Sequence, residues 1–197
     1  MCGAQVVSTA IIAPLGALAV AAHAFAVTAE SICYMPGYGI ANAAAALVGR
    51  SVGAGDMESA KRDGNICIAL GAFLMTCTGA VMMLICPLVF RMLTPVADVQ
   101  QLAARVLRIE LLAEPLFGAS IVAAGALRGA GDTLVPSLLN LGSIWLVRVG
   151  SALALVPRFG LTGMWTAMAV ELCIRGLLLL VRQMTSKYYL PMDTKRP

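Results

Sequence analysis

The amino-acid sequence predicts an all-α integral membrane protein, a polytopic bundle of helices. Hydrophobic residues make up 60% of the 197 residues and charged residues only 12%, whereas soluble globular proteins have about 45–50% and about 25%. Several apolar runs reach the length of about 20 residues that a helix needs to cross a bilayer. These runs are too long for strands and lack the alternating segments of about ten residues that are typical of membrane barrels.

The first apolar run divides at Pro14 and Gly16, because proline cannot continue a helix and glycine permits a turn. Residues 1–14 then form a stub of helix that is too short to span a bilayer, and one long helix is expected over residues 17–48. The stub has no basic residue, so it does not resemble the charged start of a signal peptide. We expect the chain to begin inside a helix, as a fragment of a longer protein or a truncated open reading frame.

Further transmembrane helices are expected along the rest of the chain. They cover residues 66–90, 102–127, 134–156 and 161–181. Together with the long first helix, they give five full transmembrane helices between residues 15 and 187. The last segment, 188–197, is expected to be a tail outside the membrane.

The basic residues near the predicted helix ends indicate the orientation, because cytoplasmic loops carry an excess of Lys and Arg. One side collects Arg50, Lys61, Arg62, Arg128, Arg182, Lys187, Lys195 and Arg196. The opposite side collects Arg91, Arg105, Arg108 and Arg158. The first side, including the tail at 188–197, is therefore expected in the cytoplasm, with the protein in the plasma membrane.

Several function classes are disfavoured. The six cysteines form no CxxC pair, so neither a disulfide framework nor a zinc site is predicted. The net charge of +4 comes from scattered basic residues rather than a patch, which argues against nucleic-acid binding. The chain has one His and no HExxH, GxSxG or paired-Asp motif in a span, so we predict that it is not an enzyme and needs no cofactor.

A four-residue turn occurs twice. Gly-Ala-Gly-Asp stands at 53–56 and again at 129–132, each time between two predicted membrane helices on the predicted cytoplasmic side. Glycine can end a helix in the left-handed conformation, and Asp can cap the next helix by accepting from its free amides. A phosphate-binding loop is disfavoured, because no strand precedes it and the glycines match neither nucleotide-binding motif.

These turns and their neighbours resemble a known family. The segments are ANAAAALVGRSVGAGD at 41–56, GALRGAGDT at 125–133, WLVRV at 145–149 and GLTGMWTAM at 160–168. In this order they are similar to the end of helix eight, the end of helix ten, helix eleven and the start of helix twelve of multidrug and toxic compound extrusion (MATE) transporters. The resemblance implies that residues 15–187 form one lobe, about helices 7–12, of a two-lobed transporter with twelve helices.

The resemblance also implies a function, secondary active efflux. An organic cationic or amphiphilic drug or metabolite would leave the cell in antiport with H⁺ or Na⁺, by rocking of two lobes around a central cavity. The implied partners are the small-molecule substrate, membrane lipid and an N-terminal lobe of the same protein.

Charged residues inside the predicted spans are candidates for this work, because a charge within a bilayer is costly. Glu30 lies in the middle of the long helix, and Glu114 follows Glu110 by one helical turn. Pro115 next to Glu114 predicts a bend or hinge. A coupling role is favoured for Glu30 and Glu114, since no local ion-pair partner is visible. In one subfamily an acidic coupling residue stands eight positions before the glycine that is Gly125 here, where this chain has Phe117.

Other candidates carry alternatives. Glu171 and Arg175 form an i, i+4 pair, which favours an internal ion pair that fixes helix register. Arg148 serves either as a partner in such a pair or in transport. Tyr34 is a candidate for lining a cavity, and Asn140 for hydrogen bonding across helices.

Two other functions stay open. One is a flippase for lipid or lipid-linked oligosaccharide from the same superfamily. Four acidic against two basic residues within the spans suit a cationic cargo better. The other is an inactive half-transporter that needs its missing N-terminal lobe.

Overall fold

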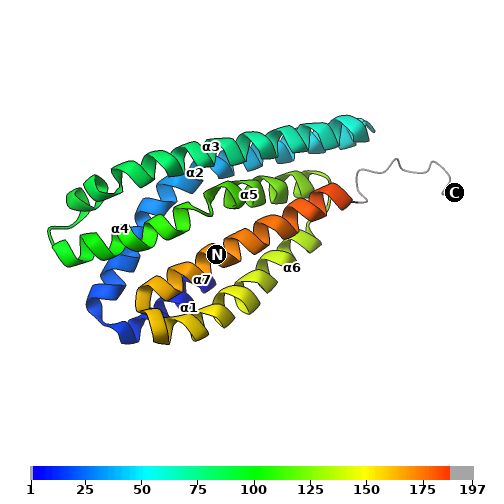
Figure 1. Cartoon of the computed structure of the whole chain (residues 1–197). Coiled ribbons are helices and arrows are strands. Elements are labelled where there is room, and N and C mark those ends of the chain that lie inside the picture. Colours follow the sequence, from blue (N-terminus) through cyan, green and yellow to red (C-terminus); the bar gives the residue numbers. More distant parts are fainter. Residues whose placement is uncertain (1, 187–197) are drawn as a thin grey trace.

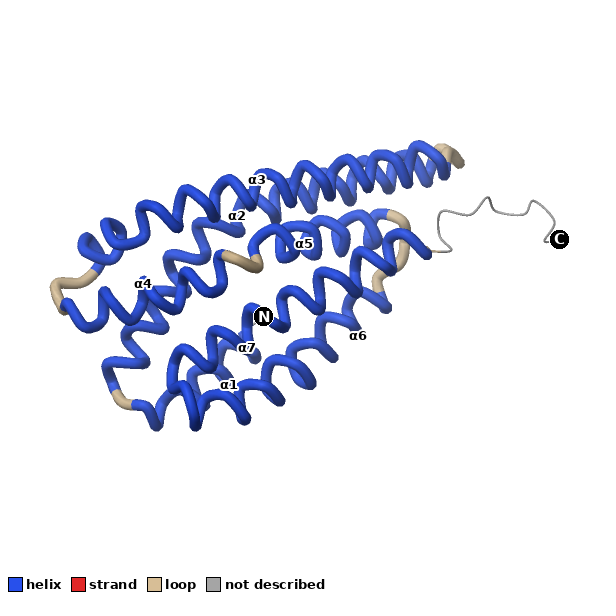
Figure 2. The backbone as a smooth tube through the Cα atoms, in the orientation of Figure 1, coloured by secondary structure: helices blue, strands red, loops and turns tan. Residues whose placement is uncertain are grey.

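The computed structural model describes residues 2–186 of the chain, with side chains from residue 5 onward (Figure 1). All regular secondary structure in this part is helical, which confirms the predicted all-α class (Figure 2). The predicted tail at 188–197 and the side chain of Cys2 lie outside the described residues.

The chain starts with α1 (Cys2–Ile12), a short 3₁₀ turn η1 (Ala13–Leu15) and the long helix α2 (Ala17–Gly53). Gly16 separates η1 from α2 with φ of 97°, a left-handed conformation that favours glycine. The break therefore falls where Pro14 and Gly16 predict it. Helix α2 continues beyond residue 48, the expected end, to the first glycine of the repeated turn.

Helix α3 (Met57–Leu93) returns along α2, and the chain then re-enters the bundle through α4 (Ala97–Leu111) and α5 (Glu114–Gly129) (Figure 1). The single helix expected over 102–127 is thus divided at residues 112–113. Pro115 lies in the first turn of α5, where its missing N–H needs no partner, so the helix breaks just before it.

The last stretch comprises α6 (Leu134–Gly142), a π-helical segment η2 (Ser143–Val149) and α7 (Gly150–Thr185). Gly160, with φ of 57°, interrupts α7 and reverses the chain. The two arms then pack closely: a Cβ added to Gly163 would lie 2.7 Å from the carbonyl carbon of Leu155. The expected helices at 134–156 and 161–181 are these two arms (Figure 1).

Three helical stretches in the described part are long and apolar enough to cross a membrane, by length and composition. They are Ala17–Gly53, Met57–Leu93 and Leu134–Thr185, the last of which contains the reversal at Gly160. The chain is therefore a multi-pass membrane protein.

The two Gly-Ala-Gly-Asp turns have the same backbone. Gly55 and Gly131 have φ of 78° and 95°, and the N–H groups of Asp56 and Asp132 donate to carbonyls five residues back, at 3.0 and 2.9 Å. Both turns lie at the end of the bundle where α7 also ends (Figure 1). The opposite end holds the α3–α4 turn.

The two aspartates differ in what they bind. The Asp56 carboxylate accepts the backbone N–H of Ser59 at 2.9 Å, as expected of a cap, and this hydrogen bond lowers the pKa of Asp56. For Asp132 the expected capping role is wrong: its buried carboxylate binds Nε and Nη2 of Arg182 at 2.8 and 2.7 Å. A charged guanidinium from α7 is the stronger partner for a buried carboxylate than a backbone amide.

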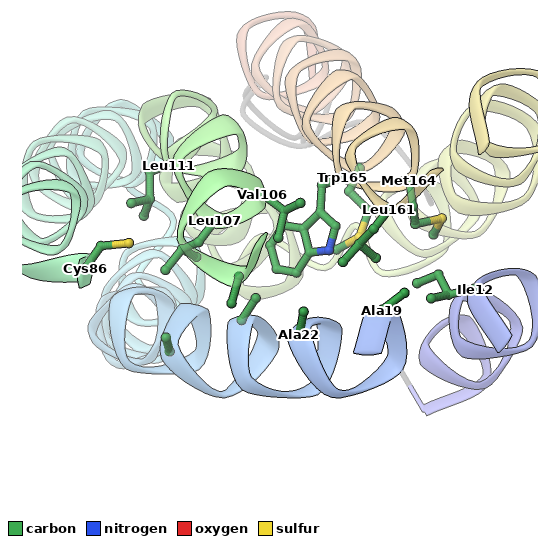
Figure 3. Packing of buried hydrophobic residues seen from close by; sticks show 14 of the residues in the cluster. Ile12, Ala19, Ala22, Cys86, Val106, Leu107, Leu111, Leu161, Met164 and Trp165 are labelled. Carbon is green, nitrogen blue, oxygen red and sulfur yellow. The ribbon is translucent and has the colours of Figure 1, made fainter. Parts of the chain in front are cut away.

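Two apolar clusters form the core. One lies towards the α3–α4 end and centres on Trp165, with Val106 of α4 beside it (Figure 3). The other lies towards the opposite end and includes Met75 and Leu127. The clusters follow one another along the bundle.

Small residues hold α5 against α2 in the second cluster. A Cβ added at Gly125 would lie 2.9 Å from Cα of Ala41, and one added at Gly129 would lie 2.9 Å from Cα of Ala45. Both spacings are one helical turn, so the backbones touch along two turns, as in small-xxx-small helix pairs of membranes. This contact fixes the depth of α5 relative to α2.

Candidate functional site

Buried charged residues lie where the two apolar clusters meet. On α2 the first cluster ends at Cys33 and the second begins at Ala41, and Glu30 stands near this junction. The corresponding junctions bring in Glu110 and Glu114 from α4 and α5, and Glu171 and Arg175 from α7. The sequence positions are far apart, but helix packing places these groups at one level of the bundle.

Three carboxyl groups form the acidic part of this level. Glu30, Glu110 and Glu114 are 6%, 2% and 1% exposed. No other described side chain donates a hydrogen bond to Oε2 of Glu30 or to the carboxyl oxygens of Glu110 and Glu114, and Glu30 and Glu110 are close enough to share a hydrogen bond with each other. Their charges act on one another, and the charge of Arg148 acts on Glu30 and Glu110. A buried carboxylate without a compensating partner is costly.

Glycine makes room for one of these groups. A Cβ added to Gly79 of α3 would lie 3.1 Å from Cγ of Glu114. The Glu114 side chain is therefore packed directly against the backbone of α3.

The second part of the level is a network around Glu171, whose side chain is fully buried. Its Oε2 accepts from Nη2 of Arg148 at 2.8 Å, and its Oε1 lies 3.5 Å from Nε of Arg175. The hydroxyl of Ser143 also donates to Oε1. One carboxylate thus binds two arginines and a serine.

The π-helical segment η2 explains how Ser143 and Arg148 reach the same partner. These two residues are five apart, a spacing that an α-helix would direct to different sides. A π-helix bonds residue i to i+5 and so stacks them. The wide turn presents both side chains to Glu171 on the facing arm of α7.

Aromatic side chains lie next to these charged groups. The Tyr34 ring meets the rings of Tyr38 and Phe117 edge to face, with centroids 5.7 and 6.0 Å apart. The guanidinium of Arg175 lies 5.4 Å from the centroid of the Phe117 ring. Phe117 therefore joins the aromatic wall to the Glu171 network.

Two adjoining cavities open at this wall. The larger has a volume of 320 Å³ and is lined by Tyr38, Asn140, Arg128 and Arg175, among others. The smaller, of 60 Å³, reaches Glu30 and shares Tyr38 and Arg175 with the larger. An apolar-walled hollow of about 300 Å³ or more with a few polar groups is typical of small-molecule sites.

The structure brings together all the candidate residues of the sequence analysis. Glu30, Tyr34, Arg148 and Arg175 line the smaller cavity, Asn140 lines the larger, and Glu171 holds the two arginines. Glu114 lies in the carboxyl cluster. Their roles in transport stay predictions.

Sequence reasoning missed three contributors, Tyr38, Arg128 and Ser143. Tyr38 follows Tyr34 by one helical turn, which is a signal that they share a face. Arg128 was counted only as a loop charge at the helix end. Ser143 had no local signal, because its role depends on the π-helical turn.

Comparison with known proteins decides the family. The MatE family model matches residues 1–153. This chain belongs to the MatE family. It is 30% identical over 175 residues to a probable multidrug resistance protein NorM of Chromobacterium violaceum, covering 86% of this chain and 38% of that protein.

Solved MATE structures have the same fold. One, described as MATE in complex with MaD3S, superposes with a TM-score of 0.86 at 18% identity, over 94% of this chain and 42% of that chain. Another, the MATE transporter ClbM in complex with Rb⁺, gives 0.84 at 22% identity, over 91% and 42%. This MatE chain thus spans about two fifths of the length of the proteins it matches.

Proposed function

We propose that the native protein exports amphiphilic organic cations in antiport with H⁺ or Na⁺. The carboxyl cluster of Glu30, Glu110 and Glu114 couples the two movements. The observation that carries the proposal is that three carboxyl groups are buried together, while no other described side chain donates a hydrogen bond to Oε2 of Glu30 or to the carboxyl oxygens of Glu110 and Glu114. In so apolar a setting each of these groups must either carry a proton or have its negative charge compensated by a cation.

Charge balance gives the mechanism. When a proton or sodium ion from outside occupies the cluster, it compensates the negative charge of the carboxylates. The cluster then no longer attracts a cationic substrate. When the cluster releases that ion to the cytoplasm, Glu30 at the wall of the smaller cavity attracts a new substrate cation. Exchange of one cation for another is then favoured over either alone.

The walls suit an amphiphile. Tyr34, Tyr38 and Phe117 offer apolar ring faces and edges, to which flat organic cations bind well. Arg128 and Arg175 at the larger cavity supply hydrogen-bond donors for acceptor groups on the other end of the molecule. One structural neighbour is described in complex with MaD3S and another in complex with Rb⁺, a monovalent cation, which supports a monovalent cation as one of the two occupants.

Alternating access requires a second wall. We infer that an N-terminal lobe of the same protein faces these cavities and rocks against this lobe, as in transporters built from repeated halves. By the distribution of basic residues, the end of the bundle with Arg50, Arg62 and Arg182 then lies on the cytoplasmic side of the plasma membrane.

An anionic cargo is the second candidate, which includes a lipid or lipid-linked oligosaccharide flippase. One observation favours it: the described residues that line the larger cavity include Arg128 and Arg175 but no carboxylate. Glu171 offsets part of the charge of Arg175, which reduces the attraction for an anion. The smaller cavity with Glu30 favours the cation.

Whole-cell efflux of ethidium tests the proposal. In a strain without its own exporters of this type, we expect Glu30→Gln, Glu110→Gln and Glu114→Gln each to reduce efflux by about tenfold or more at normal membrane levels. The matched control is Glu58→Gln, an exposed acid at the start of α3. Wild-type efflux in all three variants would contradict the coupling role.

The same strain separates the two cargo classes. If the variants lose surface glycan but retain no more ethidium than wild type, the flippase is favoured. If they retain more ethidium than wild type while the surface glycan stays intact, cation efflux is favoured.

A further inference from the structure

A basic pocket lies at the end of the bundle opposite to the repeated turns, between the end of α3 and α4. Its volume is 460 Å³, larger than the cavities of the functional site. Arg91 of α3 and Arg105 and Arg108 of α4 line it together with Gln100 and Gln101. None of the described residues that line the pocket is acidic.

The helix geometry directs the arginine and glutamine side chains of α4 towards the same pocket. Gln101, Arg105 and Arg108 follow an i, i+4, i+7 pattern and so share a face of α4. Arg91 faces them from the last turn of α3. The two helices are held together just below, where the buried Cys86 thiol donates to the carbonyl of Ala104 at 3.8 Å.

These three arginines are exposed, and they lack the carboxylate partners that the more buried Arg148, Arg175 and Arg182 have. Arg148, Arg175 and Arg182 each form an ion pair, whereas the described acidic side chains form none with Arg91, Arg105 or Arg108. Asp98 lines a neighbouring hollow of 170 Å³ with Arg105 but is not paired with it. Three like charges around one hollow repel one another, and a bound anion would relieve that repulsion.

The surface next to the pocket is strongly apolar. Leu84, Leu88 and Met92 recur every four residues along α3 and are 81%, 58% and 82% exposed. A ligand that binds the arginines can therefore lay hydrocarbon along α3 in the direction of the bilayer centre. Arginines beside exposed leucines thus offer adjoining surfaces for an anionic headgroup and for its hydrocarbon chains.

We propose that this pocket binds the phosphate group of an anionic membrane phospholipid. Guanidinium groups suit phosphate because their planar N–H groups can bind two oxygens at once. The acyl chains lie against Leu84 and Leu88. This site is separate from the carboxyl cluster, and it stands whether or not the proposed antiport is correct.

Native mass spectrometry of the purified native protein tests the proposal by counting bound phosphatidylglycerol as it is titrated. We expect saturable binding, with the affinity falling about fivefold for each arginine removed. Arg105→Gln with Arg108→Gln should therefore weaken binding by more than tenfold. The matched control is Arg158→Gln, an exposed arginine at the same end of the bundle but outside the pocket.

Two competing probes decide the source of the phosphate. Phosphatidylcholine should bind more weakly, because its choline cation meets the arginines, and inorganic phosphate at equal concentration should displace little lipid. Unchanged phosphatidylglycerol binding in the double variant would overturn the proposal, as would equal binding of phosphatidylcholine. Full displacement by inorganic phosphate would overturn the assignment to lipid. A thermal unfolding curve that matches wild type establishes that the double variant is folded.

Discussion

Replacing Glu171 with glutamine is expected to leave two buried arginines without their shared carboxylate. Nη2 of Arg148 lies 2.8 Å from Oε2 of Glu171, and Nε of Arg175 lies 3.5 Å from Oε1. The Arg148 and Arg175 side chains are 9% and 6% exposed, so water cannot replace the lost charge. Removing one partner of a buried ion pair costs about 3–5 kcal/mol. At roughly 2–4 °C per kcal/mol, the Tm should fall by about 6 °C or more.

Thermal unfolding of the purified native protein in a mild detergent measures this. The matched control is Glu58→Gln, which removes an exposed charge and should leave the Tm within about 1 °C of wild type. A triple variant, Glu171→Leu with Arg148→Met and Arg175→Met, should recover most of the loss, because a fully apolar replacement of a buried ionic group is often neutral or stabilising.

Either of two results would refute this reasoning. If Glu171→Gln melts with the wild-type Tm, the carboxylate is not holding the arginines. If the triple variant melts as low as the single one, the loss comes from packing rather than from uncompensated charge.

Four further predictions concern the backbone and the lobe. Gly125→Ala should destabilise by about 1–3 kcal/mol, since its Cβ would lie 2.9 Å from Cα of Ala41; an unfolding curve equal to wild type would contradict the close α2–α5 contact. Gly160→Ala should destabilise by about 1–3 kcal/mol because its φ is 57°, whereas Gly150→Ala, with open space around its Cβ, should not. Asp56→Ala should lower stability at neutral pH. Because a backbone N–H lowers the pKa of the Asp56 carboxyl, its contribution is present above the ordinary pKa and is lost as the pH falls through the lowered one, so wild type and variant should converge below about pH 4. Expressed alone, residues 1–197 should confer no dye efflux, since one lobe supplies one wall of the cavity; efflux by this chain alone would show that it needs no second lobe.

Local sequence rules account for the helices and for contacts within one helix or turn. The break at Gly16, the division before Pro115 and the left-handed Gly55 and Gly131 follow from what each residue permits its own backbone to do. The ion pair of Glu171 with Arg175 follows from the i, i+4 spacing. Each of these depends only on neighbours along the chain.

Identical sequence did not give identical roles. Asp56 and Asp132 occupy the same place in the same four-residue turn, yet one caps a helix and the other binds Arg182. The difference lies in what packs nearby, since only Asp132 is buried against α7. A local motif predicts the backbone and leaves the partner of the side chain open.

The sequence by itself determined that the chain is helical and crosses a membrane, because in lipid each segment must satisfy its backbone hydrogen bonds within itself. It also singled out Glu30 and Glu114 as charges that an apolar span does not carry without reason. The tertiary structure alone decided that Glu30 meets Glu110 and Glu114, that Arg148 reaches Glu171 from the facing arm, and that cavities open beside them. The physical reason is that contacts between helices depend on the depth and rotation of one helix against another. Here the depth and rotation of the helices are fixed by close backbone approaches, such as that of Gly125 to Ala41. The pattern of polar and apolar residues along the sequence does not show which backbones will approach so closely.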